Sequence, residues 1–583
     1  MEERLMGNNN VSRRALLAGA GGAAAVAATA SMTKPAEAAP APAGRPRRER
    51  RTDGRYNILL IVTDQQRSWA DVPKTVPLPG QDMVRRRGVS FDNYLINTNP
   101  CGPSRAVMYT GQHTQQNGVY LNPNSQPFPE LRKDLPTIGH MLREAGYYTA
   151  YKGKWHLSDI ELPQVSERKI EYPRGDNLLE PFGFADYNFN GERVGLTWQG
   201  FMDDGTTAAE AVNMLEAFDA GKAGDKPWFM AVNFVNPHDI MFFDARGDGE
   251  KTRARPNLIA PLFPAPGHPV YETDWKAPLP KSFYADDLST KPHAHAAIRA
   301  ASWAFYGKLD HADEAAWQRF QNYYFNCILD VDRHVATVMR ALEESGQIED
   351  TIVIYTSDHG ERGGAHGLRQ KAGTVYKEDI GVPFVIAHPQ GLKGQQTAAL
   401  GTTLDLAPTV LSLAGVDAAT RTTRHPQLKG HDLSPAAFKP DARTERDRQG
   451  SLLNYAVAYG WNQPDVPPGV ENVKPLPAPD IALRRLYRGA FDGRYKFARY
   501  FAPDQHHIPT SWEMLLRLND LELYDTLRDP DEIVNLASPA NRDKNRALIL
   551  RLSKMTNDLI AREVGVDDGA LYKGQYKVTN RTS

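Results

Sequence analysis

Four runs of consecutive apolar residues, each followed by polar residues, dominate the hydrophobic pattern of this chain. The runs cover residues 57–62, 147–151, 228–234 and 351–355. Unbroken apolar runs of this length are typical of strands buried on both faces, as in a parallel sheet. Segments with helical apolar spacing lie between them, at 137–145, 208–218 and 323–345. The alternation predicts an α/β fold with a large mixed, mostly parallel sheet that is flanked by helices.

Beyond residue 450 the apolar runs become shorter and alternate with polar residues. Asp492-Gly493 separates two of these runs and is a dipeptide typical of β-hairpin turns. A short run at 521–525 and an amphipathic stretch at 546–563 predict one more strand and a closing helix. We therefore expect a main, catalytic domain over 56–430 and a small C-terminal α+β domain over 431–583, built on an antiparallel sheet.

The first 55 residues are expected to lie outside this fold. Arg13-Arg14 precede a Gly/Ala-rich apolar stretch that ends before Ala36-Glu37-Ala38, an order that resembles a twin-arginine export signal with its cleavage site. The apolar stretch is shorter than the roughly 20 residues that a membrane span requires. We interpret 1–38 as a signal peptide and 39–55 as a basic, Pro-rich linker. The protein is then exported, periplasmic or secreted, without a stable membrane anchor.

The composition of the 583-residue chain is that of an ordinary globular protein. Its formal net charge of −1 provides no general attraction for nucleic acid, so local cations must hold any anionic substrate. Two cysteines cannot form a disulfide framework. Cys327 lies in an apolar helical stretch and is expected to be a small core residue. A disulfide between Cys327 and Cys101 is the alternative.

Cys101 is the most informative candidate residue. Pro103 and Ser104, just after it, suit the start of a helix, and Gly111 suits the end of that helix. Backbone N–H groups at a helix start stabilise negative charge, so Cys101 is a candidate acidic thiol and nucleophile. Taken by itself, however, an isolated cysteine is more often a structural residue.

The neighbouring residues change this interpretation. Residues 101–111, with the pattern C-x-P-S-R-x-x-x-x-T-G, resemble the first signature of the type I sulfatases, which belong to the alkaline phosphatase superfamily. Residues 146–156 resemble the second signature, and 357–371 resemble the metal-binding strand with its following lysine. The resemblance extends over about 56–565 and implies an alkaline phosphatase-like fold. It also implies that a formylglycine-generating enzyme oxidises Cys101 to formylglycine, whose hydrated aldehyde is the nucleophile.

The resemblance further implies a divalent metal held by Asp64, Asp358, His359 and the side chain at position 101. Such ligands suit Ca²⁺, with Mn²⁺ as the alternative. Many family members carry two adjacent aspartates in the first strand, whereas this chain has Asp64-Gln65. This departure resembles the branch of the choline sulfatases and phosphonate monoester hydrolases. It leaves open whether Gln65 is a metal ligand.

The remaining roles are also implied by the family. Lys154 and Lys371 neutralise charge on the transferring oxygens. Arg105, one helical turn from residue 101, orients the diol. His238, together with Lys371, protonates the departing oxygen, and His156 removes the proton from the second hydroxyl so that the aldehyde re-forms.

The predicted function is an exported sulfuric ester hydrolase that releases sulfate and an alcohol from a small-molecule or carbohydrate sulfate ester. The alternative on the same scaffold, favoured by Gln65, is a phosphonate monoester or phosphodiester hydrolase. A cysteine-dependent hydrolase without formylglycine and a non-catalytic binding protein are two further hypotheses. Residues 241–307, rich in Pro, Asp and Lys, are expected to form a long surface excursion that shapes the substrate pocket. The oligomeric state is not predicted.

Overall fold

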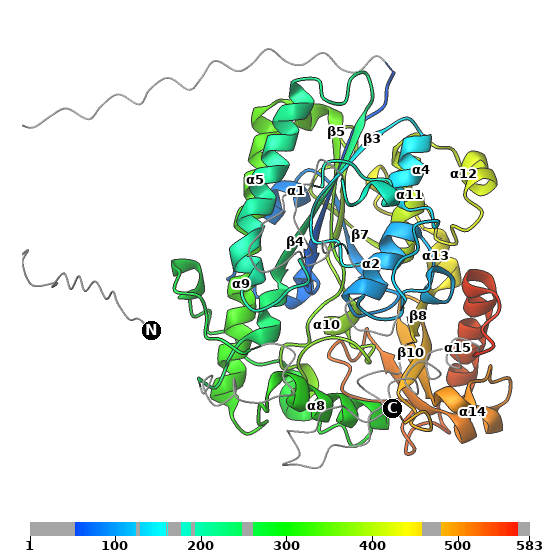
Figure 1. Ribbon diagram of the computed structural model, residues 1–583. Coiled ribbons are helices and arrows are strands. Elements are labelled where there is room, and N and C mark those ends of the chain that lie inside the picture. The colour runs from blue at the N-terminus through cyan, green and yellow to red at the C-terminus, as the bar shows by residue number, and fades with distance from the viewer. Residues whose placement is uncertain are drawn as a thin grey trace, which may run out of the picture. The chain divides into compact units, whose positions relative to one another are not determined.

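The computed structural model describes residues 53–123, 129–158, 160, 177–187, 193–247, 261–456 and 480–569. Figure 1 shows these residues as a coloured ribbon. The predicted signal peptide and nearly all of the predicted linker lie outside the described residues. Within them, no helix is long and apolar enough to cross a membrane.

A seven-stranded sheet forms the centre of the larger part of the fold. Its strands, in spatial order, are β3 (Tyr148–Gly153), β4 (Trp228–Pro237), β1 (Asn57–Asp64), β5 (Thr351–Ser357), β6 (Phe384–Ala387), β2 (Val89–Leu95) and β7 (Gln395–Thr402). Only β6 runs antiparallel to its neighbours. Every residue of β1, β4 and β5 is buried, which explains why these strands are continuous apolar runs. The predicted mixed, mostly parallel sheet is confirmed.

Helices cover both faces of this sheet. The α-helices of the described residues are α1 (Pro79–Arg85), α2 (Cys101–Thr110), α3 (Thr114–Asn117), α4 (Ile138–Glu144), α5 (Gln199–Asp219), α7 (Lys281–Ala285), α8 (His293–Tyr306), α9 (Glu314–Glu344), α10 (Lys377–Ile380), α11 (Leu406–Leu413), α12 (Ala418–Arg424), α13 (Glu445–Gln449), α14 (Trp512–Leu518) and α15 (Arg546–Leu559). Helices α1, α5 and α9 pack on one face, where Leu59 and Ile61 of β1 point. Helices α2, α4 and α11 pack on the other face, against Ile58 and Leu60 (Figure 1).

Two helices are longer than the sequence predicts. The helix expected at 323–345 begins at Glu314, where the Asp313 side chain caps it by accepting a hydrogen bond from Ala316 N–H. Its extra turns carry Trp317 and Phe320, which are buried. These turns lie beyond the sheet and pack against the segment 241–307, so their apolar spacing reflects a different partner from that of the later turns.

Residues 241–307 are more than the surface excursion that the sequence predicts. Within their described part, α7 and α8 form, and Tyr271, Leu279 and Phe283 are buried against the first turns of α9. The apolar residues are scattered among prolines and charged residues, so no periodicity reveals them. They are buried because α9 presents an apolar face that the sheet does not cover.

A four-stranded antiparallel sheet follows, in the order β11 (Asp520–Asp525), β10 (Tyr495–Phe501), β9 (Leu486–Phe491) and β8 (Ser451–Tyr455). The predicted hairpin joins β9 to β10, with Gly493 at φ +95°. Helix α15 packs along β9 and continues as a π-helical turn, Ile560–Val564. The smaller sheet is therefore confirmed, whereas the domain boundary at 430/431 stays a prediction. Cys101 and Cys327 are both free, so the alternative disulfide is wrong.

A buried ion cluster ties α15 to the rest of the fold. Arg446 of α13 donates to both carboxylate oxygens of Asp405 and to Glu563, and His113 lies 3.0 Å from Glu563. Burial opposes ionisation of Glu563, but the charge of Arg446 outweighs it and lowers the pKa of this carboxyl to about 2. The cluster thus stabilises the fold only while Glu563 is ionised.

We expect Glu563→Gln to lower the free energy of unfolding at pH 7 by about 3 kcal/mol, because the pKa of Glu563 falls about 2.5 units below its usual 4.5. A lowered carboxyl pKa stabilises the folded state above pH 4.5. That contribution is lost as the pH falls towards 2. Denaturant unfolding of both proteins should therefore show a difference that shrinks with acid. Glu445→Gln, on a half-exposed side chain of α13, is the control. A pH-independent difference would contradict the prediction.

Candidate active site and metal centre

The carboxyl ends of four neighbouring parallel strands bring the predicted site residues together. Strand β1 ends at Asp64, and β5 leads directly into Asp358 and His359. Strand β3 leads into Lys154, and β4 leads into the 3-10 helix η3 (His238–Phe242). Because parallel strands end at the same edge of a sheet, residues far apart in sequence share one site there.

Four buried side chains at this edge form a group that suits a metal ion. One ligand atom each from Asp64, Cys101, Asp358 and His359 lies within 4.8 Å of the others. His359 Nε2 lies 3.0 Å from Cys101 Sγ, and Asp64 Oδ1 lies 3.7 Å from the same sulfur. The buried carboxylates of Asp64 and Asp358 repel one another unless a cation lies close to both. Carboxylate oxygens together with the imidazole of His359 are ligands that suit Ca²⁺ or Mn²⁺. The donor set therefore fits the implied divalent metal.

Helix α2 carries Cys101 into this group. The helix begins at Cys101 itself, not at Pro103 or Ser104 as the sequence suggests, and Gly111 ends it at φ +64° as expected. Ser104 does not cap the helix, because its hydroxyl donates to the backbone carbonyl of Asp358 and ties α2 to the end of β5. Burial and Asp64 oppose ionisation of the Cys101 thiol. The charges of Lys371, Lys154 and His359 nevertheless lower its pKa.

Two cations contact the metal-binding carboxylates directly. Lys154 Nζ lies 2.6 Å from Asp64 Oδ2. Arg105 Nε donates to Asp358 Oδ2 at 3.0 Å, while its Nη1 donates to Asn233 Oδ1. Arg105 thus neutralises a carboxylate of the candidate metal group, and its predicted role at the diol stays a prediction. Asn233 was missed from the sequence, although it is a polar residue within the otherwise apolar run of β4.

Gln65, whose role the sequence left open, holds its side chain between two charged residues. Its Oε1 accepts a hydrogen bond from Lys371 Nζ at 2.5 Å, and its Nε2 donates to Glu361 Oε2 at 2.6 Å. Its backbone N–H donates to Asp358 Oδ1. The amide of Gln65 therefore links Lys371 to Glu361 beside the metal group. Glu361 was also missed, although it lies in the string 357–371 that resembles the family's metal strand.

The two predicted proton-transfer residues are buried beside these cations. Burial, followed by the charges of Lys371 and Lys154, lowers the pKa of His238 well below its usual range. Burial, followed by the charge of Lys154, does the same for His156. Both imidazoles are therefore neutral at pH 7. The structure brings all the predicted site residues into one region, and their catalytic roles stay predictions.

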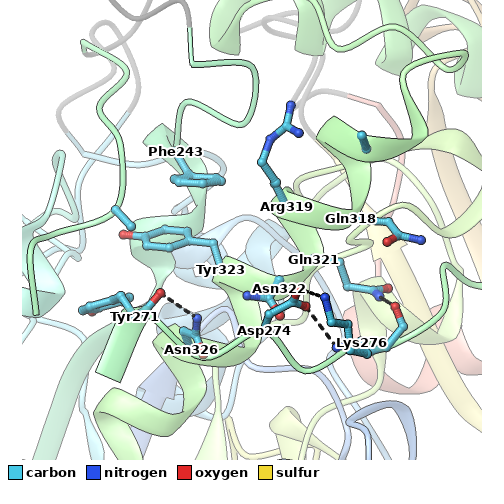
Figure 2. Close-up of a pocket in the computed structure, with 13 residues that line it drawn as sticks. Phe243, Tyr271, Asp274, Lys276, Gln318, Arg319, Gln321, Asn322, Tyr323 and Asn326 are labelled. Carbon is cyan, nitrogen blue, oxygen red and sulfur yellow. Dashed lines mark hydrogen bonds and ion pairs between the residues drawn. The ribbon is translucent and has the colours of Figure 1, made fainter. Parts of the chain in front are cut away.

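A cavity of about 350 Å³ lies between α9 and the segment 265–277. Figure 2 shows its lining, in which Phe243 stacks on Tyr323 at a ring distance of 4.1 Å. The amides that line it donate to backbone carbonyls of the facing segment. None of the predicted site residues lines this cavity, and its side chains serve to hold the segment against α9.

Removal of the metal is expected to lower the melting temperature of the protein, because the paired carboxylates then lose their cation. Adding Ca²⁺ at about 100 times its Kd to chelator-treated protein should restore about 2.7 kcal/mol of stability. Thermal unfolding with Ca²⁺, Mn²⁺ or no metal measures this effect, and the ion effective at the lowest concentration is the preferred one. Asp64→Asn should abolish the shift. An equal shift in that variant would place the cation elsewhere.

Comparison with known proteins agrees with this geometry. The Sulfatase family model matches residues 56–416. An arylsulfatase of Volvox carteri is 27% identical over 511 residues, covering 83% of this chain and 71% of that protein. An N-acetylglucosamine-6-O-sulfatase of Bacteroides thetaiotaomicron is 25% identical over 545 residues, covering 86% of each chain. A choline-sulfatase of Rhizobium meliloti is 26% identical over 512 residues, covering 83% of each chain.

Solved structures share the fold at lower sequence identity. A 2-O GAG sulfatase superposes with a TM-score of 0.59 at 22% identity, covering 89% of this chain and 94% of the other. A phosphonate monoester hydrolase from Silicibacter pomeroyi superposes with a TM-score of 0.59 at 21% identity, covering 88% and 96%. The family model spans more than half of the 583 residues and includes Asp64, Cys101, Asp358 and His359. The chain is therefore an enzyme of the sulfatase family, a sulfuric ester hydrolase with an alkaline phosphatase-like fold.

Proposed function

We propose that this enzyme is exported and hydrolyses a sulfate ester through a formylglycine at position 101 and one divalent metal, Ca²⁺. The observation that carries the proposal is the position of Cys101 Sγ, which lies within 4.8 Å of ligand atoms of Asp64, Asp358 and His359. The thiol marks the place of the formylglycine hydroxyls, so the nucleophile and the metal ligand are the same residue. A bound metal supplies Lewis-acid polarisation and lowers the pKa of an attacking hydroxyl.

The chemistry requires two hydroxyl groups on residue 101, and a thiol has none. One hydroxyl of the hydrated aldehyde loses its proton and its oxygen attacks sulfur. The bond from sulfur to the alcohol oxygen then breaks, and that oxygen gains a proton. The second hydroxyl then loses its proton, the aldehyde re-forms, and the bond from the residue to the sulfate oxygen breaks. Sulfate and alcohol are the products, and water restores the diol.

The chain's own residues manage the charge and the protons of this reaction. Lys154 contacts Asp64 of the metal group and Lys371 contacts the neighbouring Gln65, so both ammonium groups can neutralise charge on the sulfate oxygens. The Lys371 ammonium supplies the proton of the departing alcohol oxygen, and the neutral imidazole of His238 beside it relays that proton. His156 accepts the proton of the second hydroxyl. Both histidines follow strands whose ends define the site.

The proposed export and the proposed maturation of the enzyme are supported by the sequence alone. The twin-arginine pattern of 1–38 supports transport of the folded enzyme, after a formylglycine-generating enzyme has oxidised Cys101. The destination is the periplasm or the medium. The printed activities of the relatives support a small-molecule or carbohydrate sulfate ester as the substrate.

A phosphonate monoester or phosphodiester is the second candidate substrate. The observation that favours it is Gln65, which replaces the second metal-binding aspartate of many sulfatases and hydrogen-bonds Lys371. The pair Asp64-Gln65 resembles that of the phosphonate monoester hydrolases. Phosphonate monoesters and phosphodiesters are monoanions like sulfate esters, so the same cations can hold them.

Two measurements test the proposal. Mass spectrometry of the peptide that contains residue 101, after co-expression with a formylglycine-generating enzyme, should show an aldehyde in place of the thiol. The modified enzyme is then assayed with an aryl sulfate, a phosphonate monoester and a phosphodiester. The proposal expects the highest kcat/KM for the sulfate. A higher value for the phosphonate or the phosphodiester would support the second candidate instead.

A further inference from the structure

The two ends of the segment 241–307 meet beside the proposed catalytic residues. At its first end, Met241 and Phe242 belong to η3, the same short helix as His238. At its other end, Tyr306 is the last residue of α8. The rings of Phe242 and Tyr306 lie 6.3 Å apart, and Met241, Leu262 and Phe305 pack with them. We call Met241, Phe242 and Tyr306 the apolar wall.

The apolar wall borders the groups that act on the ester. The ring of Phe242 lies 6.3 Å from that of His238. Met241 Sδ lies 3.9 Å from Lys371 Nζ. Tyr306 joins these residues through the contact of its ring with that of Phe242. The wall therefore lies beside His238 and Lys371.

Gly195 packs against the ring of His238. A Cβ atom on Gly195 would lie 2.5 Å from His238 Nδ1, so the backbone of Gly195 presses against the ring. Gly195 itself is held by its N–H, which donates to Gln199 Oε1. The alcohol part of a substrate whose leaving oxygen meets His238 therefore cannot extend past Gly195.

The wall is also hydrogen-bonded to the two residues that precede Lys371. Arg369 Nη2 donates to the carbonyls of Tyr306, at 3.0 Å, and of Ser302, which fixes the end of α8. Gln370 Nε2 donates to the carbonyl of Met241. Both anchors directly precede Lys371. The positions of the wall and of the Lys371 ammonium are thus set together.

We propose that Met241, Phe242 and Tyr306 bind the alcohol part of the substrate and select an apolar ring over a polyhydroxylated sugar. This inference rests on the proposed function, which places the alcohol oxygen at His238. A hydrocarbon ring loses unfavourable contact with water against a thioether and two aromatic rings. Sugar hydroxyls would lose water here, and within the wall only the Tyr306 hydroxyl offers a side-chain hydrogen bond in return.

The test compares cyclohexylmethyl sulfate with glucose 6-sulfate. Both are primary esters on a six-membered ring, so the two differ mainly in the hydroxyl groups that the wall would meet. We expect kcat/KM to be at least about tenfold higher for the cyclohexylmethyl ester. Met241→Gln should reduce this ratio several-fold by raising the KM of the cyclohexylmethyl ester. Met202→Gln, at a methionine of α5 that is 59% exposed, is the matched control and should leave the ratio unchanged.

Binding to the Cys101→Ser variant, measured by calorimetry with each ester, separates this inference from the proposed function. Faster turnover of glucose 6-sulfate, or an unchanged ratio in Met241→Gln, would overturn the wall's role and leave the sulfatase activity standing. If the enzyme hydrolyses neither ester, the proposed sulfatase function is contradicted. The role of the wall is then judged from the calorimetric affinities of the two esters. Tighter binding of the cyclohexylmethyl ester supports it, whereas equal binding or none contradicts it.

Discussion

Replacing Cys101 with serine is expected to lower kcat/KM for any sulfate ester by about four orders of magnitude or more, because residues that form the reacting bond contribute effects of this size. A serine provides one hydroxyl at the same position, so it can attack sulfur once. It has no second hydroxyl to re-form a carbonyl and expel the sulfate. The variant should therefore lose turnover or become trapped as a sulfate ester, which intact-protein mass spectrometry detects.

Cys327→Ala is the control for this substitution. Cys327 is a free, buried cysteine of α9 that packs among aromatic residues and lies outside the metal group. Its replacement should reduce stability modestly and leave turnover close to that of the native enzyme. Full multiple-turnover activity of Cys101→Ser would refute the formylglycine mechanism and favour a simpler nucleophile.

Lys154→Met should lower kcat/KM by about 10²–10³-fold, the usual cost of removing one preorganised charge from a transition state. The side chain is fully buried, and its Nζ lies 2.6 Å from Asp64 Oδ2. Methionine preserves the unbranched shape but removes the charge. The loss should appear in kcat as well as in KM, because the sulfate oxygens gain negative charge during transfer.

Lys152→Met provides a matched control on the same strand. Lys152 is also buried, but its Nζ donates to the carbonyl of Asp186, away from the metal group. Both substitutions remove a buried ammonium, so both should destabilise the fold to a similar degree in thermal unfolding. Only Lys154→Met should also lower kcat/KM, by more than its loss of stability explains. Equal losses of kcat/KM would show that Lys154 acts through stability alone.

Much of the fold follows from local pattern. The buried strands β1, β4 and β5 are continuous apolar runs because both of their faces are covered. Their existence, and the hairpin at Gly493, were therefore predictable. The lengths of α5 and α9 were not, because their first turns contact different partners from their later ones. The apolar residues of 241–307 lack any period and become a core only against α9.

The candidate site was likewise predictable from the sequence only in part. The residue types and their positions after strand ends predicted a metal group and a nucleophile, since parallel strands deliver their carboxyl ends to one edge. Glu361 and Asn233 were not predicted, because their roles depend on hydrogen bonds to other site residues. No local signal distinguishes such residues from ordinary polar ones.

By itself, the sequence determined the family resemblance, the central strands, the nucleophile position and the metal-ligating residue types. These depend on short motifs and on the periodicity of burial, which are local properties. Only the tertiary structure decided that Gln65 hydrogen-bonds Lys371, a partner 306 residues away, and that Arg105 pairs with Asp358. It also decided that the two ends of 241–307 close into one apolar wall. Contacts between such distant segments depend on how whole elements pack, and no local pattern encodes which side chains will then meet.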